Sequence, residues 1–175
     1  TQNSTWAVVI GISDYQEPAI PDLRFADKAA EAFAQFLRSP GGGALDNDHL
    51  KVLLNEKATA GKVGEALGWL LDICKEGDQA IIYFSGHGDV ERKIMSQPGY
   101  LLCWDASPQV YMSGGVLKIN DFHDIIATLS LQSKVKVVVI SDACHAGKLA
   151  GESIGGAQAT TANLAKQFAN EIKIL

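Results

Sequence analysis

Cysteine is scarce in this chain of 175 residues, which contains only Cys74, Cys103 and Cys144. A small and odd number of cysteines argues against a disulfide scaffold and fits reduced thiols in a cytosol-like compartment. The first residues also lack the basic flank and apolar segment of a signal peptide. We therefore expect a cytoplasmic protein.

An excess of basic residues and long apolar runs are missing as well. Lys and Arg number 15 against 20 Asp and Glu, so the net charge of −5 gives no reason to expect nucleic acid or an anionic membrane as a partner. No run approaches the roughly 18 apolar residues of a membrane span, and no repeat of solenoid length is present. With 47% apolar residues, the chain can form one domain with a sizeable core.

What the chain has instead is a series of uninterrupted β-branched and apolar runs. Such runs predict strands that are buried on both faces, the usual state of strands in a parallel sheet. The predicted strands cover residues 7–10, 50–54, 80–84, 100–104 and 137–140. Apolar residues at helical spacing predict three intervening helices, with capping residues Asp22, Thr59 and Asn120. This order predicts an α/β fold with a mostly parallel central sheet flanked by helices.

Two of these strands lead directly into short polar segments. One segment contains His87 between two glycines, and the other contains Cys144. Because the carboxyl ends of parallel strands meet at one edge of a sheet, neighbouring strands would bring the imidazole and the thiol together, as nucleophilic catalysis requires. A lone cysteine at a strand end is more often a small buried hydrophobe. Glycines on both sides of a histidine, however, let the backbone approach a ligand closely.

Four segments, taken in order, resemble the caspase-fold cysteine peptidases, and the prokaryotic metacaspase-like (orthocaspase) branch most closely. Together they span nearly the whole chain. The segments are Val8-Val9-Ile10-Gly11-Ile12 with Tyr15, Leu23 through Ala29, Tyr83-Phe84-Ser85-Gly86-His87-Gly88, and Ser141-Asp142-Ala143-Cys144-His145-Ala146-Gly147. The histidine also precedes the cysteine by close to the roughly 50 residues found in caspases. Animal caspases differ in having Gln-Ala-Cys where this chain has Asp-Ala-Cys.

The resemblance implies a three-layer caspase-like fold and an acyl-transfer reaction. Cys144 would attack the scissile carbonyl as a thiolate, which a nearby imidazolium makes available at neutral pH. His87 would then protonate the leaving amine. The backbone N–H groups of Cys144 and Gly88 would be the oxyanion donors, placed where negative charge develops.

The resemblance also implies cleavage after Arg or Lys, since metacaspases share the aspartate two positions before the nucleophile. Asp142, Asp27 and Ser85 would line the primary specificity pocket. Carboxylates in such a pocket pair with a guanidinium or ammonium group and repel an acidic side chain. The alternative for Asp27 is an ordinary solvated charge near a helix start.

The end of the chain predicts a boundary within a longer polypeptide. Residues 148–166 are rich in Gly, Ala, Ser and Thr, so we expect a mobile linker, which matches the region where family members are cut to release activity. Lys148 and Lys166 are candidate autoprocessing sites or two ordinary solvated lysines. Residues 171–175 resemble the start of the small subunit. We therefore expect residues 1–175 to form a single catalytic domain, with the small-subunit segment and a regulatory or sensor domain as partners.

The sequence requires no cofactor. No metal-ligand spacing indicates zinc, and the carboxylates after His87 are too scattered to define the calcium site that some metacaspases use, which leaves calcium open. The expected partner is a protein or peptide substrate. A caspase-fold pseudoenzyme or interaction module is the alternative function, and the intact pair of His87 and Cys144 favours the peptidase.

Overall fold

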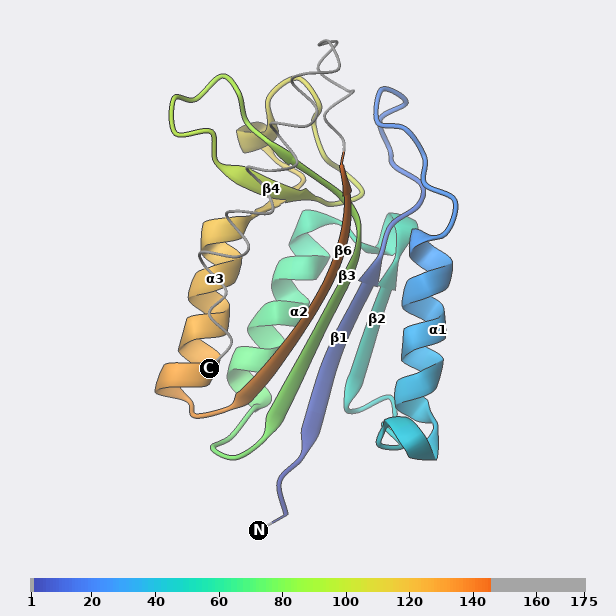
Figure 1. Ribbon diagram of the computed structural model, residues 1–175, viewed down its shortest axis with the longest axis vertical. Helices are drawn as coiled ribbons and strands as arrows, with labels where there is room; N and C mark the ends of the chain where they lie inside the picture. Colours follow the sequence, from blue (N-terminus) through green and yellow to red (C-terminus); the bar gives the residue numbers. More distant parts are fainter. Residues whose placement is uncertain (1, 146–175) are drawn as a thin grey trace.

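The chain folds into a central β-sheet with helices on both sides (Figure 1). The computed structural model describes residues 2–145, with side chains as far as Ala143. The strands are β1 (Thr5–Gly11), β2 (Leu50–Leu54), β3 (Gln79–Val90), β4 (Gly99–Leu102), β5 (Val116–Lys118) and β6 (Lys136–His145). The helices are α1 (Ala26–Arg38), α2 (Ala60–Ile73) and α3 (Ile119–Ala127).

β3 is the central strand of the sheet. β1 pairs with its first half in parallel, β2 lies parallel beyond β1, and β6 runs parallel along the other edge of β3. The last residues of β3 instead pair antiparallel with β4, and β5 extends that ladder. The predicted parallel core is therefore present, with a short antiparallel ladder at one end that carries one strand, β5, which the sequence did not indicate.

Helices cover the two faces of this sheet. Side chains along each strand alternate between the faces, so the apolar runs place apolar side chains on both of them. Val9 and Tyr83 belong to the apolar cluster under α1, whereas Val8 and Ile82 belong to the larger cluster with α2 and α3. Burial on both faces explains the uninterrupted apolar runs of β1 and β3. The three-layer α/β architecture expected from the sequence is confirmed.

α1 lies close to the end of β1, and Gly11 makes this approach feasible. A Cβ at Gly11 would lie only 2.3 Å from the Cβ of Ala30 and 2.7 Å from the carbonyl oxygen of Ala26. No side chain larger than hydrogen fits there without moving the helix. The first turn of α1, which carries Asp27, can therefore rest directly on the sheet.

Two strands run further than the sequence predicts. β3 continues past residue 84 to Val90, and β6 continues past residue 140 to His145. Polar residues and glycines extend these strands because the ladder between them holds their backbones in register as far as Gly88 and His145. His87 and Cys144 consequently lie within paired strands, not in loops that follow them.

The predicted start of the first helix is wrong. α1 begins at Ala26, four residues after the expected cap Asp22. The N–H of Leu23 donates to the carbonyl oxygen of Ser13 at 2.8 Å, which holds this segment in the loop. The hydroxyl of Ser13 also accepts the N–H of Asp27, so a residue from the loop caps the helix.

The other two predicted caps have opposite outcomes. Thr59 caps α2 as expected, since its hydroxyl accepts the N–H of Lys62 at 3.2 Å. The predicted cap Asn120 is wrong because α3 already begins at Ile119, with Lys118 at the capping position and no side-chain hydrogen bond there. β5 runs directly into this helix and fixes its first residue.

Several sequence-based expectations fall outside the described residues. These are the linker at 148–166 with Lys148 and Lys166, and the small-subunit start at 171–175. Among residues 2–145, no helix is both long and apolar enough to span a membrane.

Candidate active site

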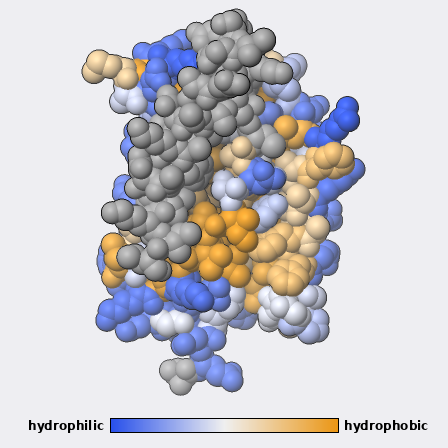
Figure 2. Space-filling model, in the orientation of Figure 1, coloured by the Kyte–Doolittle hydropathy of each residue, from blue (hydrophilic) through white to orange (hydrophobic). Residues whose placement is uncertain are grey.

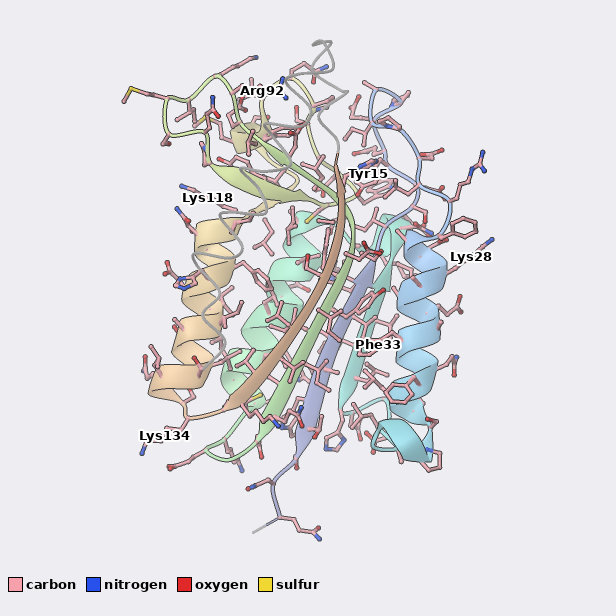
Figure 3. All side chains as sticks on the ribbon, in the orientation of Figure 1. Tyr15, Lys28, Phe33, Arg92, Lys118 and Lys134 are labelled. Carbon is pink, nitrogen blue, oxygen red and sulfur yellow. The ribbon has the colours of Figure 1, made fainter. Side chains whose placement is uncertain are left out.

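His87 is buried in β3 with only 4% of its surface exposed, and both its ring and its backbone are held by the loop between β1 and α1. Its Nε2 lies 2.7 Å from the carbonyl oxygen of Pro21. Because a carbonyl oxygen can only accept, Nε2 carries the proton. The backbone N–H of His87 donates to the hydroxyl of Tyr15 at 2.8 Å, and the two rings are 5.1 Å apart. Figure 3 shows Tyr15 beside the upper ends of β3 and β6.

The second ring nitrogen of His87 is in a different situation. Nδ1 is buried, and no described residue provides a hydrogen-bond partner for it. With the proton fixed on Nε2, the neutral ring presents Nδ1 as an acceptor. Since an unpaired buried polar atom costs free energy, such an atom in a folded protein calls for a functional explanation. Nδ1 is the atom at which this ring can take up or release a proton.

Cys144 lies directly across the ladder from His87. The two residues are Cα partners in the parallel pairing of β3 and β6. Adjacent strands in a sheet are about 4.8 Å apart. The topology therefore makes close neighbours of two residues that are distant in sequence, as the sequence predicts for a shared sheet edge.

The N–H of Gly88 faces β6. In a strand, the N–H and C=O of one residue point to the same neighbour, and successive residues alternate between the two neighbours. The carbonyl oxygen of Ser85 accepts from Ile12 after β1, and the N–H of Glu91 donates to Pro98 beside β4, so odd-numbered residues here face β1 and β4. The N–H of Gly88 thus points toward the strand that contains Cys144.

The three predicted pocket residues come together on the same face of the sheet as His87. Gly11, Ser85 and Asp142 form one row across β1, β3 and β6, in direct register. Asp27 lies over Gly11, since a Cβ there would be 3.1 Å from its Cα. Ser85 is buried, Asp27 is half-buried and Asp142 is exposed, so the row is more open to solvent toward β6.

Hydrogen bonds keep Asp27 ionised. Its Oδ1 accepts from the hydroxyl of Ser13 at 2.7 Å and from the N–H of Lys28 at 2.8 Å, and its Oδ2 accepts from Nδ2 of Asn55 at 3.2 Å. The bond from Ser13 is the largest cause of a lowered pKa for Asp27. Burial acts in the opposite direction, and Asn55 and the backbone N–H groups add to the lowering.

Tyr83 forms the floor beside this row. Its ring stacks on Phe33 at 4.8 Å, and Figure 3 shows Phe33 projecting from α1 toward the sheet. Burial raises the pKa of Tyr83, the hydrogen bond with Ser85 opposes this, and the charge of Asp142 adds to it. The carboxylate of Asp142 therefore lies close enough to act on this buried hydroxyl.

Apolar side chains accompany the site on the molecular surface. Figure 2 shows them gathered in the middle of the view, over the sheet. Ile140, two residues before Asp142 on the same side of β6, is 38% exposed, and Phe25, just before α1, is 67% exposed. The carboxylates thus stand beside surface to which an apolar part of a ligand can bind.

Sequence reasoning missed Pro21, Ser13 and Asn55. Pro21 acts through its carbonyl oxygen, which no residue type reveals. Ser13 and Asn55 contact Asp27 from the ends of two different strands. The only available signal was position, because Asn55 directly follows one predicted strand and Ser13 lies three residues after another, at the edge where ligands bind.

In the part of the chain that the structure describes, no three His, Cys, Asp or Glu residues are grouped so as to hold a metal ion. Two of the carboxylates that left calcium open are engaged elsewhere. The hydroxyl of Tyr111 donates to Asp89 at 2.6 Å, and the N–H of Tyr111 donates to Glu91 at 2.9 Å. Both carboxylates are buried and anchor the segment before β5.

Comparison with known proteins places this geometry in context. A family model described as the caspase domain matches residues 4–171. A crystal structure of a protein from Geobacter sulfurreducens is similar with a TM-score of 0.63 and 19% sequence identity, covering 98% of this chain and 67% of that chain. At this identity the likeness shows the fold alone. No match was found among curated proteins.

Proposed function

The chain belongs to the caspase-domain family, and on this premise we propose that it is a cysteine endopeptidase in which His87 and Cys144 are the catalytic pair. One observation carries the proposal: His87 and Cys144 are partners across two parallel strands, and Nδ1 of the histidine is buried without a partner among the described residues. An imidazole nitrogen kept free beside a cysteine is what a thiol nucleophile requires.

The contacts of His87 support different roles for its two nitrogens. The carbonyl oxygen of Pro21 holds the Nε2 proton, so Nδ1 takes the proton from the thiol of Cys144. The imidazolium that forms remains bonded to this carbonyl oxygen through Nε2. A positive ring next to the thiol favours the thiolate at neutral pH.

The reaction then proceeds by acyl transfer. The thiolate of Cys144 attacks the scissile carbonyl carbon, a C–S bond forms, and the carbonyl electrons move to oxygen. The N–H groups of Gly88 and Cys144 stabilise that oxyanion. When the intermediate collapses, the C–N bond breaks and the leaving amine takes the proton from Nδ1. Water next gives a proton to Nδ1, its hydroxide attacks the thioester, and the acid leaves as the thiolate re-forms.

We assign to the pocket a preference for Arg or Lys at the cleaved position. Asp27 and Asp142 supply the negative charge, and Ser85 lies between them in the row. The lowered pKa of Asp27, caused first by Ser13, supports a carboxylate that is charged throughout the neutral range. A guanidinium or ammonium group pairs with such carboxylates, whereas an acidic side chain is repelled.

Fluorogenic peptides with Arg, Lys or Asp at the cleaved position test the activity in the full-length protein. We expect turnover of Arg and Lys peptides, and none with Cys144→Ala. Cys74→Ala is the matched control, because burial, followed by the charge of Asp78, raises the pKa of Cys74 to about 11 and keeps that thiol protonated. Turnover by neither wild type nor variant would favour an interaction module. Preference for Asp would refute the pocket and leave the catalytic pair intact.

Activity measured in the presence of EDTA decides whether the proposed peptidase requires calcium.

We also propose that Lys148 and Lys166 are autoprocessing sites, since a protease with this pocket would accept them in its own chain. Mass spectrometry of wild type and Cys144→Ala after incubation tests this, with cleavage after either lysine expected in wild type only. Cleavage elsewhere, or cleavage in the variant, would contradict it.

A further inference from the structure

Asn55 has an unusual backbone at the end of β2. It opens a 3-10 turn (Asn55–Lys57) with φ of +49°. Residues other than glycine adopt this left-handed backbone conformation at a cost in free energy, and asparagine is one of the few residue types that tolerate it. A residue held in such a conformation is worth examining for what its side chain does.

The side-chain amide of Asn55 joins two segments that are distant in sequence. Its Oδ1 accepts the N–H of Ser13 at 2.8 Å and the N–H of Asp14 at 3.2 Å. Its Nδ2 donates to Oδ2 of Asp27 at 3.2 Å. One amide thus ties the start of the loop between β1 and α1 to the carboxylate on the first turn of α1. Only a side chain that both accepts and donates can make this set of bonds.

The same loop holds the histidine. Leu23 donates its N–H to the carbonyl oxygen of Ser13, which closes the base of the loop. Pro21, two residues earlier, accepts the Nε2 proton of His87. The position of that carbonyl oxygen therefore depends on the segment to which Asn55 is bonded.

We propose that Asn55 is a positioning residue that couples the specificity carboxylate of Asp27 to the orientation of His87. The coupling rests on the proposed peptidase function for its effect on catalysis. Its Nδ2 bond fixes the carboxylate that binds the basic side chain of the substrate. Its Oδ1 bonds fix the loop whose carbonyl oxygen sets the proton on the histidine. Binding and chemistry would thus share one anchor.

Two substitutions separate these roles. Asn55→Asp keeps the acceptor for the loop N–H groups but removes the donor and places a second carboxylate against Asp27. Two adjacent carboxylates cannot both ionise easily, so one of them binds a proton at a higher pH than usual. We expect KM for an Arg peptide to rise about fivefold or more, which is the change expected from the loss of one hydrogen bond. We expect kcat to stay within about twofold of wild type. The rise in KM should be largest near neutral pH and decrease as the pH is raised.

Asn55→Gly keeps the left-handed backbone and removes both sets of bonds. We expect KM to rise as in the first variant and kcat to fall about fivefold or more, because the loop carbonyl is less well held. The loop keeps other anchors, among them the bond from Gln16 N–H to Trp104, so the variant should fold. Controls are Ala44→Gly, at a position with φ of +53°, and Asn47→Asp, on an exposed loop; both should retain wild-type kinetics.

A second readout does not depend on turnover. The ¹⁵N shifts of the His87 ring should report a proton on Nε2 in wild type and in Asn55→Asp, and a mixture of tautomers in Asn55→Gly. Unchanged ring shifts in Asn55→Gly would overturn the coupling. Wild-type kinetics in both variants would also overturn it. So would a loss of kcat in Asn55→Asp as large as that in Asn55→Gly. Absence of turnover in wild type with the expected shifts would refute the peptidase and retain the coupling to the ring.

Discussion

The hydroxyl of Tyr15 offers a sharp test of how His87 is held. Tyr15→Phe removes one oxygen atom and leaves the ring in place. That oxygen accepts the backbone N–H of His87 at 2.8 Å and donates to the carbonyl oxygen of Leu102 at 3.4 Å. Because Tyr15 and His87 are both less than 10% exposed, the N–H of His87 would be left buried without an acceptor.

The cost follows from these two contacts. An unsatisfied buried donor costs about 1–3 kcal/mol, and the longer bond to Leu102 adds little. We therefore expect the free energy of unfolding to fall by about 1–3 kcal/mol. For a domain of this size, each kcal/mol lowers Tm by about 2–4 °C. Urea unfolding at pH 7 and a thermal scan measure both quantities.

Tyr100→Phe is the matched control for this measurement. Tyr100 is also buried, but its hydroxyl has no hydrogen-bond partner among the residues whose side chains the structure describes, so its removal should change the stability by less than about 0.5 kcal/mol. The reasoning would be refuted if Tyr15→Phe were as stable as this control. In that case the hydroxyl would contribute nothing to holding the histidine, and the N–H would have found another acceptor.

Three further predictions concern other parts of the structure. Tyr111→Phe should lower the free energy of unfolding by about 1.5–3 kcal/mol in urea, because it removes the donor at 2.6 Å from the buried carboxylate of Asp89. Asp78→Asn should destabilise the protein at pH 7: burial alone would raise the pKa of Asp78, but three N–H donors hold it below the ordinary value. Because the pKa of Asp78 is lower in the folded protein, its carboxylate stabilises the fold at pH values above the unfolded pKa of about 3.9. The difference in free energy of unfolding between Asp78→Asn and wild type should therefore narrow below that pH. A difference that is constant across pH would contradict this. Gly11→Ala should lower Tm through an overpacking cost of about 1–3 kcal/mol, whereas Gly64→Ala, at a helical position with open space around it, should raise Tm; equal shifts in the two would contradict the close approach of α1.

The strands were predictable because their apolar runs have a single physical explanation. Val8 and Ile82 are buried on one face of the sheet, and the residues that follow them, Val9 and Tyr83, are buried on the other. Both faces of these strands must therefore be apolar. The lengths of β3 and β6 were not predictable. Beyond residue 84 the side chains are small or polar, and only the pairing of one strand with the other keeps those residues extended.

The site was predictable to the level of residue types but not of partners. The polar segments after two strands indicated His87 and Cys144 as candidates, since chemistry is expected at that edge, whereas the pocket role of Asp142 was implied by the resemblance to metacaspases. The atom that orients the histidine belongs to the backbone of Pro21, and backbone atoms carry no sequence signal. The start of α1 was wrong for a related reason: a hydrogen bond between Leu23 and Ser13, formed only in the fold, overrides the local preference for a cap at Asp22.

The central place of β3 has a consequence for biosynthesis. Among the described elements, β1, α1 and β2 leave the ribosome before β3, which adds to β1, and β6 follows them all. Chains emerge from the amino end and begin to fold in that order. A nascent polypeptide can therefore assemble Asp27, Ser85 and His87 before it contains Cys144, so under the proposed function an unfinished translation product would have most of the proposed recognition surface and lack the proposed nucleophile.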